Sequence, residues 1–205
     1  AVDYTTYDYP QALDVFSSTL NSLQNYVSTL SQNDNTRFRS SETGYTFADL
    51  NESINTLRSV DYATLSSYVL GKNVTKDKAS LAIYYQYRID NLNRNLSSAN
   101  EKLATIADSI KNYQKDSMEV MAGADATSSS ALTQPSEAYD DLISQKTDAQ
   151  SSVSSYQQQI ADYQSRLDKL NSSAVASKKD QEKVETDMKT VCDKLNKLID
   201  DVNAT

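Results

Sequence analysis

An apolar residue recurs every three or four positions along two long stretches of the chain, and this repeat limits the possible folds most. The first seam has steps of four and three through Tyr85, Ile89, Leu92, Leu96, Ala99, Leu103, Ile106, Ile110, Tyr113, Ser117 and Val120. The second runs through Tyr139, Leu142, Lys146, Ala149, Val153, Tyr156, Ile160, Tyr163, Leu167, Leu170 and Ala174. Such spacing places the seam on one side of a helix, as in a coiled coil. We therefore expect two long helices to pack antiparallel around a tip at residues 122–135.

The phase of the second seam continues beyond the length that the first helix can cover. It passes the polar positions Ser177 and Gln181 and becomes apolar again at Val184, Met188, Val191, Leu195, Leu198 and Val202. We expect a weakened but continuous helix through residues 174–181. Because the first arm starts near Thr75, residues beyond 184 must pack on other helices.

The N-terminal third supplies those other helices. Apolar residues at helical spacing predict helices at 11–31, 46–58 and 61–70, and Thr46 with Asp49 resembles a capping box. The sequence thus predicts an all-α fold, a helical base with a long antiparallel two-helix coiled-coil arm. Residues 1–75 form the N-terminal part of the base, 76–183 the hairpin, and 184–205 a C-terminal helix returning to the base. Residues 1–9 are Tyr- and Thr-rich, and a strand there is left open.

The composition argues against catalysis and against several ligand classes. The chain has no His, one Cys, three Gly and two Pro, and it lacks a Gly-rich phosphate loop. We therefore predict no catalytic, cofactor-binding or metal-binding residues and no enzymatic activity. The net charge of −8 and the interleaving of Lys and Arg with acids predict that nucleic acid is not a partner.

Tyrosine is enriched to 14 copies, and three of them crowd the start of the first long helix beside Arg88. Tyr84, Tyr87 and Arg88, together with Arg37 and Arg39, are a candidate surface for a partner or a glycan, because Tyr combines a flat apolar face with a polar tip. The alternative, which we weigh more heavily, is that these tyrosines pack where the arm leaves the base.

Three segments between Arg37 and Leu92 resemble a known family. They read FRSSETGYTFADL at residues 38–50, NVTKDK at 73–78 and YYQYRIDNL at 84–92. These sequences are similar to those of extracytoplasmic loops in Wzz-like polysaccharide chain-length determinants, also called polysaccharide co-polymerases, of anaerobic Gram-positive bacteria. Better-known members carry an α/β base, whereas this sequence predicts no confident strand.

The resemblance implies a non-enzymatic, extracytoplasmic domain held between two membrane helices in the cell membrane. It implies self-association side by side, contact with the membrane polymerase or export machinery, and control of surface-polysaccharide length. It carries no active-site residues. Two alternatives stay open, namely a secreted or cell-surface interaction or sensor module, and a cytosolic coiled-coil scaffold.

Overall fold

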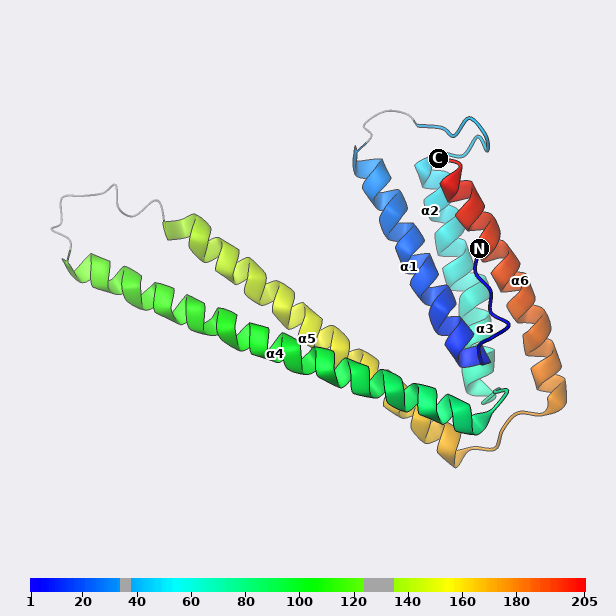
Figure 1. Cartoon of the computed structure of the whole chain (residues 1–205). Coiled ribbons are helices and arrows are strands. Elements are labelled where there is room, and N and C mark those ends of the chain that lie inside the picture. Colours follow the sequence, from blue (N-terminus) through cyan, green and yellow to red (C-terminus); the bar gives the residue numbers. More distant parts are fainter. Residues whose placement is uncertain (34–37, 124–134) are drawn as a thin grey trace. The chain divides into compact units, whose positions relative to one another are not determined.

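The computed structural model describes residues 1–33, 38–123 and 135–205, with the side chains of 119–136 left out. All regular structure in these ranges is helical (Figure 1). The elements are α1 (Tyr9–Asn33), α2 (Phe47–Thr56), the π-helix η1 (Leu57–Tyr62), α3 (Ala63–Gly71), α4 (Lys78–Gly123), α5 (Pro135–Ser172) and α6 (Lys178–Asn203). Residues 1–8 form no strand. Two compact units result: the base, residues 1–84 with 166–205, and the hairpin, residues 85–165.

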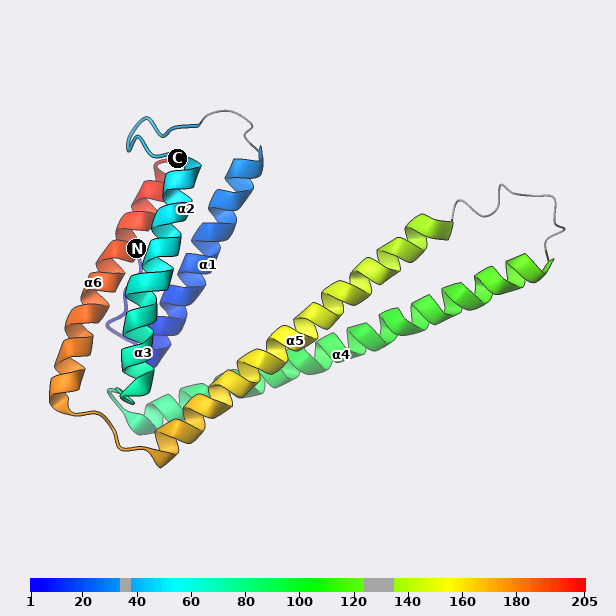
Figure 2. The ribbon, with the colours of Figure 1, turned by 180° about the vertical axis from the view of Figure 1, so that it is seen from behind.

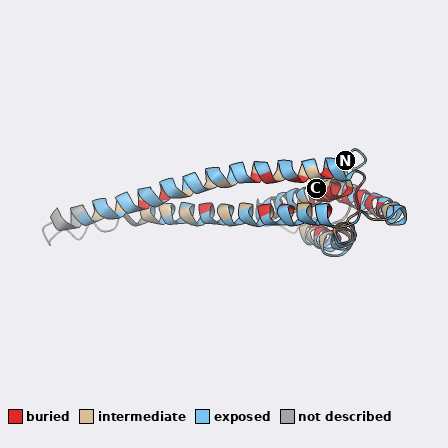
Figure 3. Ribbon diagram, turned by 90° about the horizontal axis from the view of Figure 1, so that it is seen from below, coloured by how far each residue is buried: buried red, intermediate tan, exposed pale blue. Residues whose placement is uncertain are grey.

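The hairpin unit confirms the predicted antiparallel pair of long helices. Every seam position from Tyr85 to Ser117 on α4, and from Tyr139 to Leu170 on α5, is buried or partly buried. Figure 3 shows buried and intermediate residues recurring along both long helices between exposed ones. Ile106 and Ile110 pack with Ala149, so the seam supplies the unit's core. The expected tip at 122–135 falls mostly on residues 124–134, which lie outside the described ranges.

The base unit is built from α1, the α2–η1–α3 element and α6, which lie side by side in both views (Figures 1 and 2). These helices enclose one apolar core that includes Phe16, Ile54 and Val69. The α6 positions predicted to need a partner, Val184, Met188, Val191, Leu195, Leu198 and Val202, are all buried in this core. The expectation that the C-terminal helix packs on the N-terminal helices is therefore confirmed.

The expectation of one continuous helix through residues 174–181 is wrong. α5 ends at Ser172, and Ser177 caps α6 by accepting a hydrogen bond from the Asp180 backbone at 3.2 Å. The intervening linker is fixed to the turn after α3: the Asn73 carbonyl accepts from Ala176 N at 3.2 Å, and the Asn73 amide donates to Ser173 O at 3.4 Å. These hydrogen bonds satisfy backbone groups that the helix would otherwise pair.

The helices expected at 46–58 and 61–70 are one uninterrupted element. Thr46 and Asp49 form the predicted capping box at its start, with Thr46 N donating to the Asp49 carboxylate at 2.8 Å. Leu57–Tyr62 adopt a π-helix, so the chain continues from α2 into α3 without a new cap. A π-helical turn changes the direction in which the following side chains point.

The N-terminal segment runs antiparallel to α6. The Tyr9 hydroxyl donates a hydrogen bond to the Glu185 carboxylate at 2.6 Å. Nearer the N-terminus, the backbone N–H of Val2 donates to the side-chain oxygen of Asn196, and the Val2 carbonyl accepts from the Asn196 amide. Glu185 and Asn196 are about 16 Å apart along a helix with a rise of ~1.5 Å per residue. From Tyr9 back to Val2 the chain therefore follows α6 in the direction of its C-terminal end, and the N-terminus lies beside α6 partway along it (Figure 1).

Candidate functional site

The candidate residues of the base lie at its two ends. Arg39 is in the loop before α2, where its guanidinium donates to the Gly44 carbonyl at 2.6 Å. Tyr84 donates its hydroxyl to Asp14, in the second turn of α1, at 2.8 Å. Since α1 runs from the Asp14 end of the base toward the loop, Arg39 and Tyr84 do not form one surface. Arg37 lies outside the described residues.

The candidate residues of the hairpin unit have different environments. Arg88 lies over the Tyr163 ring, 5.4 Å from its centroid, and Tyr163 in turn contacts Tyr85. Tyr87 is 59% exposed on the outer side of α4. Arg88 thus packs on α5 within the hairpin unit, whereas Tyr87 stays accessible.

Tyr9, Tyr62 and Tyr68 also lie in the base, and the pKa values of their hydroxyl groups are raised there. Burial, followed by the hydrogen bond to Glu185, raises the pKa of Tyr9. The hydrogen bond to Asp180 raises the pKa of Tyr68 and lowers the pKa of Asp180. Burial also raises the pKa of Tyr62. Tyr9 and Tyr68 thus tie the start of α1 and α3, respectively, to α6.

The raised pKa of Tyr9 predicts a loss of stability at alkaline pH. A group whose folded pKa is raised contributes stability that is complete below its unfolded pKa, here 10.0, and is lost as pH rises through the folded value. Tyr9→Phe removes this contribution, so the gap in free energy of unfolding between wild type and variant should narrow above about pH 10. Urea unfolding at several alkaline pH values measures it, and a gap independent of pH contradicts the assignment.

A polar groove lies at the end of the base where α6 ends. It has a volume of about 810 Å³, within the ~300–1,000 Å³ range of ligand sites. One wall comes from α2 and η1, the other from α6, and residues of the loop before α2 complete the lining. We call it the polar groove; its lining includes Arg39, Tyr45, Asp49, Glu52, Asp61, Lys194, Lys197 and Asp201.

Charged groups of opposite sign line the two walls of the polar groove. Lys194 on α6 reaches across to Asp61 on η1 at 3.1 Å, and Lys197 pairs with Asp201 at 3.0 Å. The hydrogen bond to Asp201 raises the pKa of Lys197, and backbone hydrogen bonding at Thr46 lowers the pKa of Asp49. Both groups are therefore charged near neutral pH.

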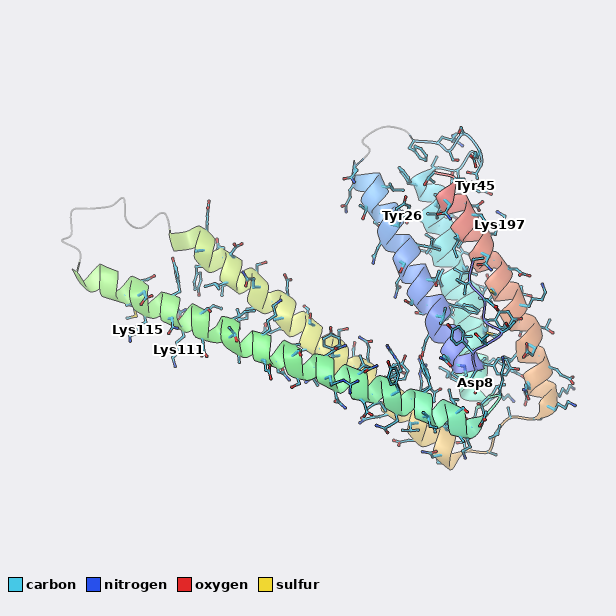
Figure 4. The ribbon with its side chains drawn as sticks, in the orientation of Figure 1. Asp8, Tyr26, Tyr45, Lys111, Lys115 and Lys197 are labelled. Atoms are coloured by element: carbon cyan, nitrogen blue, oxygen red, sulfur yellow. The ribbon has the colours of Figure 1, made fainter. Side chains whose placement is uncertain are left out.

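Sequence reasoning singled out Arg39 but missed the rest of the groove. Figure 4 shows Tyr45 and Lys197 close together at this end of the base. The Lys197 ammonium lies 5.7 Å from the Tyr45 ring centroid, although the two residues belong to opposite ends of the sequence. No local pattern indicates that pairing, because it depends on how α6 docks on the α2–η1 element.

The described residues hold no group of three or more His, Cys, Asp or Glu side chains that could bind a metal ion. Cys192 is buried, and its thiol donates to the Val2 carbonyl at 3.2 Å. Among the helices as far as they are described, none is both long and apolar enough to cross a bilayer.

Comparisons with protein-family models, with curated proteins and with solved structures find no match to this chain.

Proposed function

We propose that this chain is the non-enzymatic, extracytoplasmic domain of a membrane-anchored regulator of surface-polysaccharide length and export. The course of the N-terminal segment along α6 carries the proposal. Because Val2 is hydrogen-bonded near the C-terminal part of α6, both chain ends are directed to one end of the base. A domain suspended between two membrane helices is compatible with this arrangement, since both helices would enter the same bilayer.

One of the three segments that carry the resemblance, residues 38–50, lies at the end of the base where α6 ends. Phe38 stacks on Phe47 with ring centroids 4.5 Å apart, which folds the loop back onto the start of α2. The Ser40 hydroxyl donates to the Ala204 carbonyl at 2.9 Å and so joins this loop to the C-terminal end of α6. The loop that carries part of the resemblance and the C-terminal end of α6 therefore belong to one region of the base.

Deleting the complete gene from its host tests the proposal directly. A length regulator predicts that the surface polysaccharide changes its length distribution on a gel while sugar is still polymerised, and that the intact gene restores the original distribution. The gene should also encode an apolar helix of about 20 residues on each side of residues 1–205. An unchanged distribution in the deletion strain, or a gene without either helix, overturns the proposal.

A further inference from the structure

We propose that the polar groove binds a short stretch of a neutral, hydroxyl-rich glycan. This inference deepens the proposed function and rests on it for the source of the glycan. It assigns the ligand to the groove rather than to the hairpin.

The floor of the polar groove is apolar. Leu57, the first residue of η1, and Leu198 on α6 line it and are 4% and 7% exposed. An apolar floor below polar walls suits a sugar ring, which presents C–H groups on its faces and hydroxyls around its edge. Ligand sites commonly combine apolar lining with a few placed polar groups in this way.

The walls of the polar groove offer both hydrogen-bond donors and hydrogen-bond acceptors to the hydroxyl groups around a sugar ring. Glu52 and Asp49 on α2 present carboxylate oxygens, which accept hydrogen bonds, while Lys194 and Lys197 on α6 present ammonium groups, which donate them. A hydroxyl both donates and accepts, so one sugar can bond to both walls. Glu52 is exposed and takes part in no ion pair within the described part of the chain, which leaves its carboxylate available.

Tyr45, in the loop before α2, supplies an aromatic face to the groove. It is 38% exposed, although Lys197 contacts its ring. The exposed part of the ring remains for an apolar sugar face. Tyrosine suits such a contact, because its ring is apolar while its hydroxyl can remain in water.

The charge of the lining selects the class of glycan. Three basic residues, Arg39, Lys194 and Lys197, face four acidic ones, Asp49, Glu52, Asp61 and Asp201. A site for phosphorylated or uronic polymers needs an excess of cations, as anion binding at phosphate sites shows. The near balance with a slight acidic excess favours a neutral sugar.

Binding of defined pools to the full chain tests the inference. The probes are neutral and anionic fragments prepared by partial hydrolysis of the host's own surface polysaccharide, and titration calorimetry measures affinity. The neutral pool should bind, and Tyr45→Ala should weaken binding about tenfold, the equivalent of ~1.4 kcal/mol. The matched control Tyr26→Ala changes a 51% exposed tyrosine on α1, outside the groove, and should leave affinity unchanged (Figure 4).

A second pair of variants tests the acceptor wall. Glu52→Gln keeps the shape of an exposed side chain but removes its charge, and it should weaken binding of the neutral pool severalfold. Glu101→Gln makes the same change on an exposed position of α4 and should have no effect. Absence of neutral binding, preference for the anionic pool, or equal effects of groove and control variants overturns the inference.

The same variants separate this inference from the proposed function. The complete gene carrying Tyr45→Ala, returned to the deletion strain, should fail to restore the original length distribution. If that gene restores it fully while the deletion alters it, the groove inference fails and the proposed function stands. If the deletion itself has no effect, the proposed function fails, whatever the groove binds.

Discussion

Phe16→Ala should lower the free energy of unfolding of the base by about 3–5 kcal/mol, as truncation of a buried aromatic side chain does. Phe16 is fully buried at the centre of the base core. Its ring also meets the Tyr4 ring edge-on, with centroids 6.3 Å apart, so it links α1 to the N-terminal segment. The variant loses this burial and leaves a cavity that fixed helices fill only in part. Urea unfolding followed by tyrosine fluorescence measures the loss, since the chain has no Trp.

Tyr26→Ala is the control for this prediction, because it removes an aromatic side chain from the same helix at a 51% exposed position. Its cost should stay below about 1 kcal/mol, as for surface substitutions that break no special contact. Similar losses in the two variants would contradict the placement of Phe16 in the core. The sequence alone does not separate these positions, since both lie in the apolar repeat of residues 11–31.

The helical periodicity predicted the pairing of elements well, for a physical reason. Each long helix packs on a single partner, so its buried residues lie on one side and recur at helical spacing, as Ile89 and Ile160 do. This spacing can be read directly from the sequence. The buried positions of α6 followed from the same argument, because apolar residues beyond the reach of the first arm needed another partner. The base and the hairpin were therefore predictable from spacing.

The break between α5 and α6 was not predictable from that spacing. Leu170 and Val184 are 14 residues apart, which is two heptads, so the apolar phase is preserved although the chain leaves the helix between them. The linker contains neither Gly nor Pro, and what holds it is the turn at Asn73. Asn73 has a φ of 57°, a conformation that Asn adopts more readily than most residues.

The polar groove could not be predicted from the sequence for a similar reason. Its acidic residues on α2 repeat at a spacing that also suits a solvated helix face, and so do Lys194 and Lys197 on α6. Only the docking of α6 against α2 and η1 turns two ordinary polar faces into opposing walls. Sequence patterns report which face of a helix is buried, but not which polar faces border the same groove.

Ile106→Asp should open the hairpin unit while leaving the base folded. Ile106 is 5% exposed and packs with Ile110 and Ala149. The variant loses the packing of a buried Ile, worth roughly 2–5 kcal/mol on truncation, and adds the cost of burying a carboxylate. An extended pair of helices has few other buried contacts to offset this, so opening is the cheaper response. Hydrogen exchange should show lost amide protection in α4 and α5 around residue 106.

Ser98→Asp is the matched control, because it adds the same carboxylate to α4 at an exposed position off the seam. Protection around residue 98 should stay at the wild-type level in this variant, which separates the effect of burial from that of added negative charge. In Ile106→Asp, α1 and α6 should retain their protection, since the core residues described for these helices belong to the base unit. Loss of protection in α1 and α6 as well would mean that the base depends on the hairpin for its stability, contrary to the self-contained core that encloses Phe16.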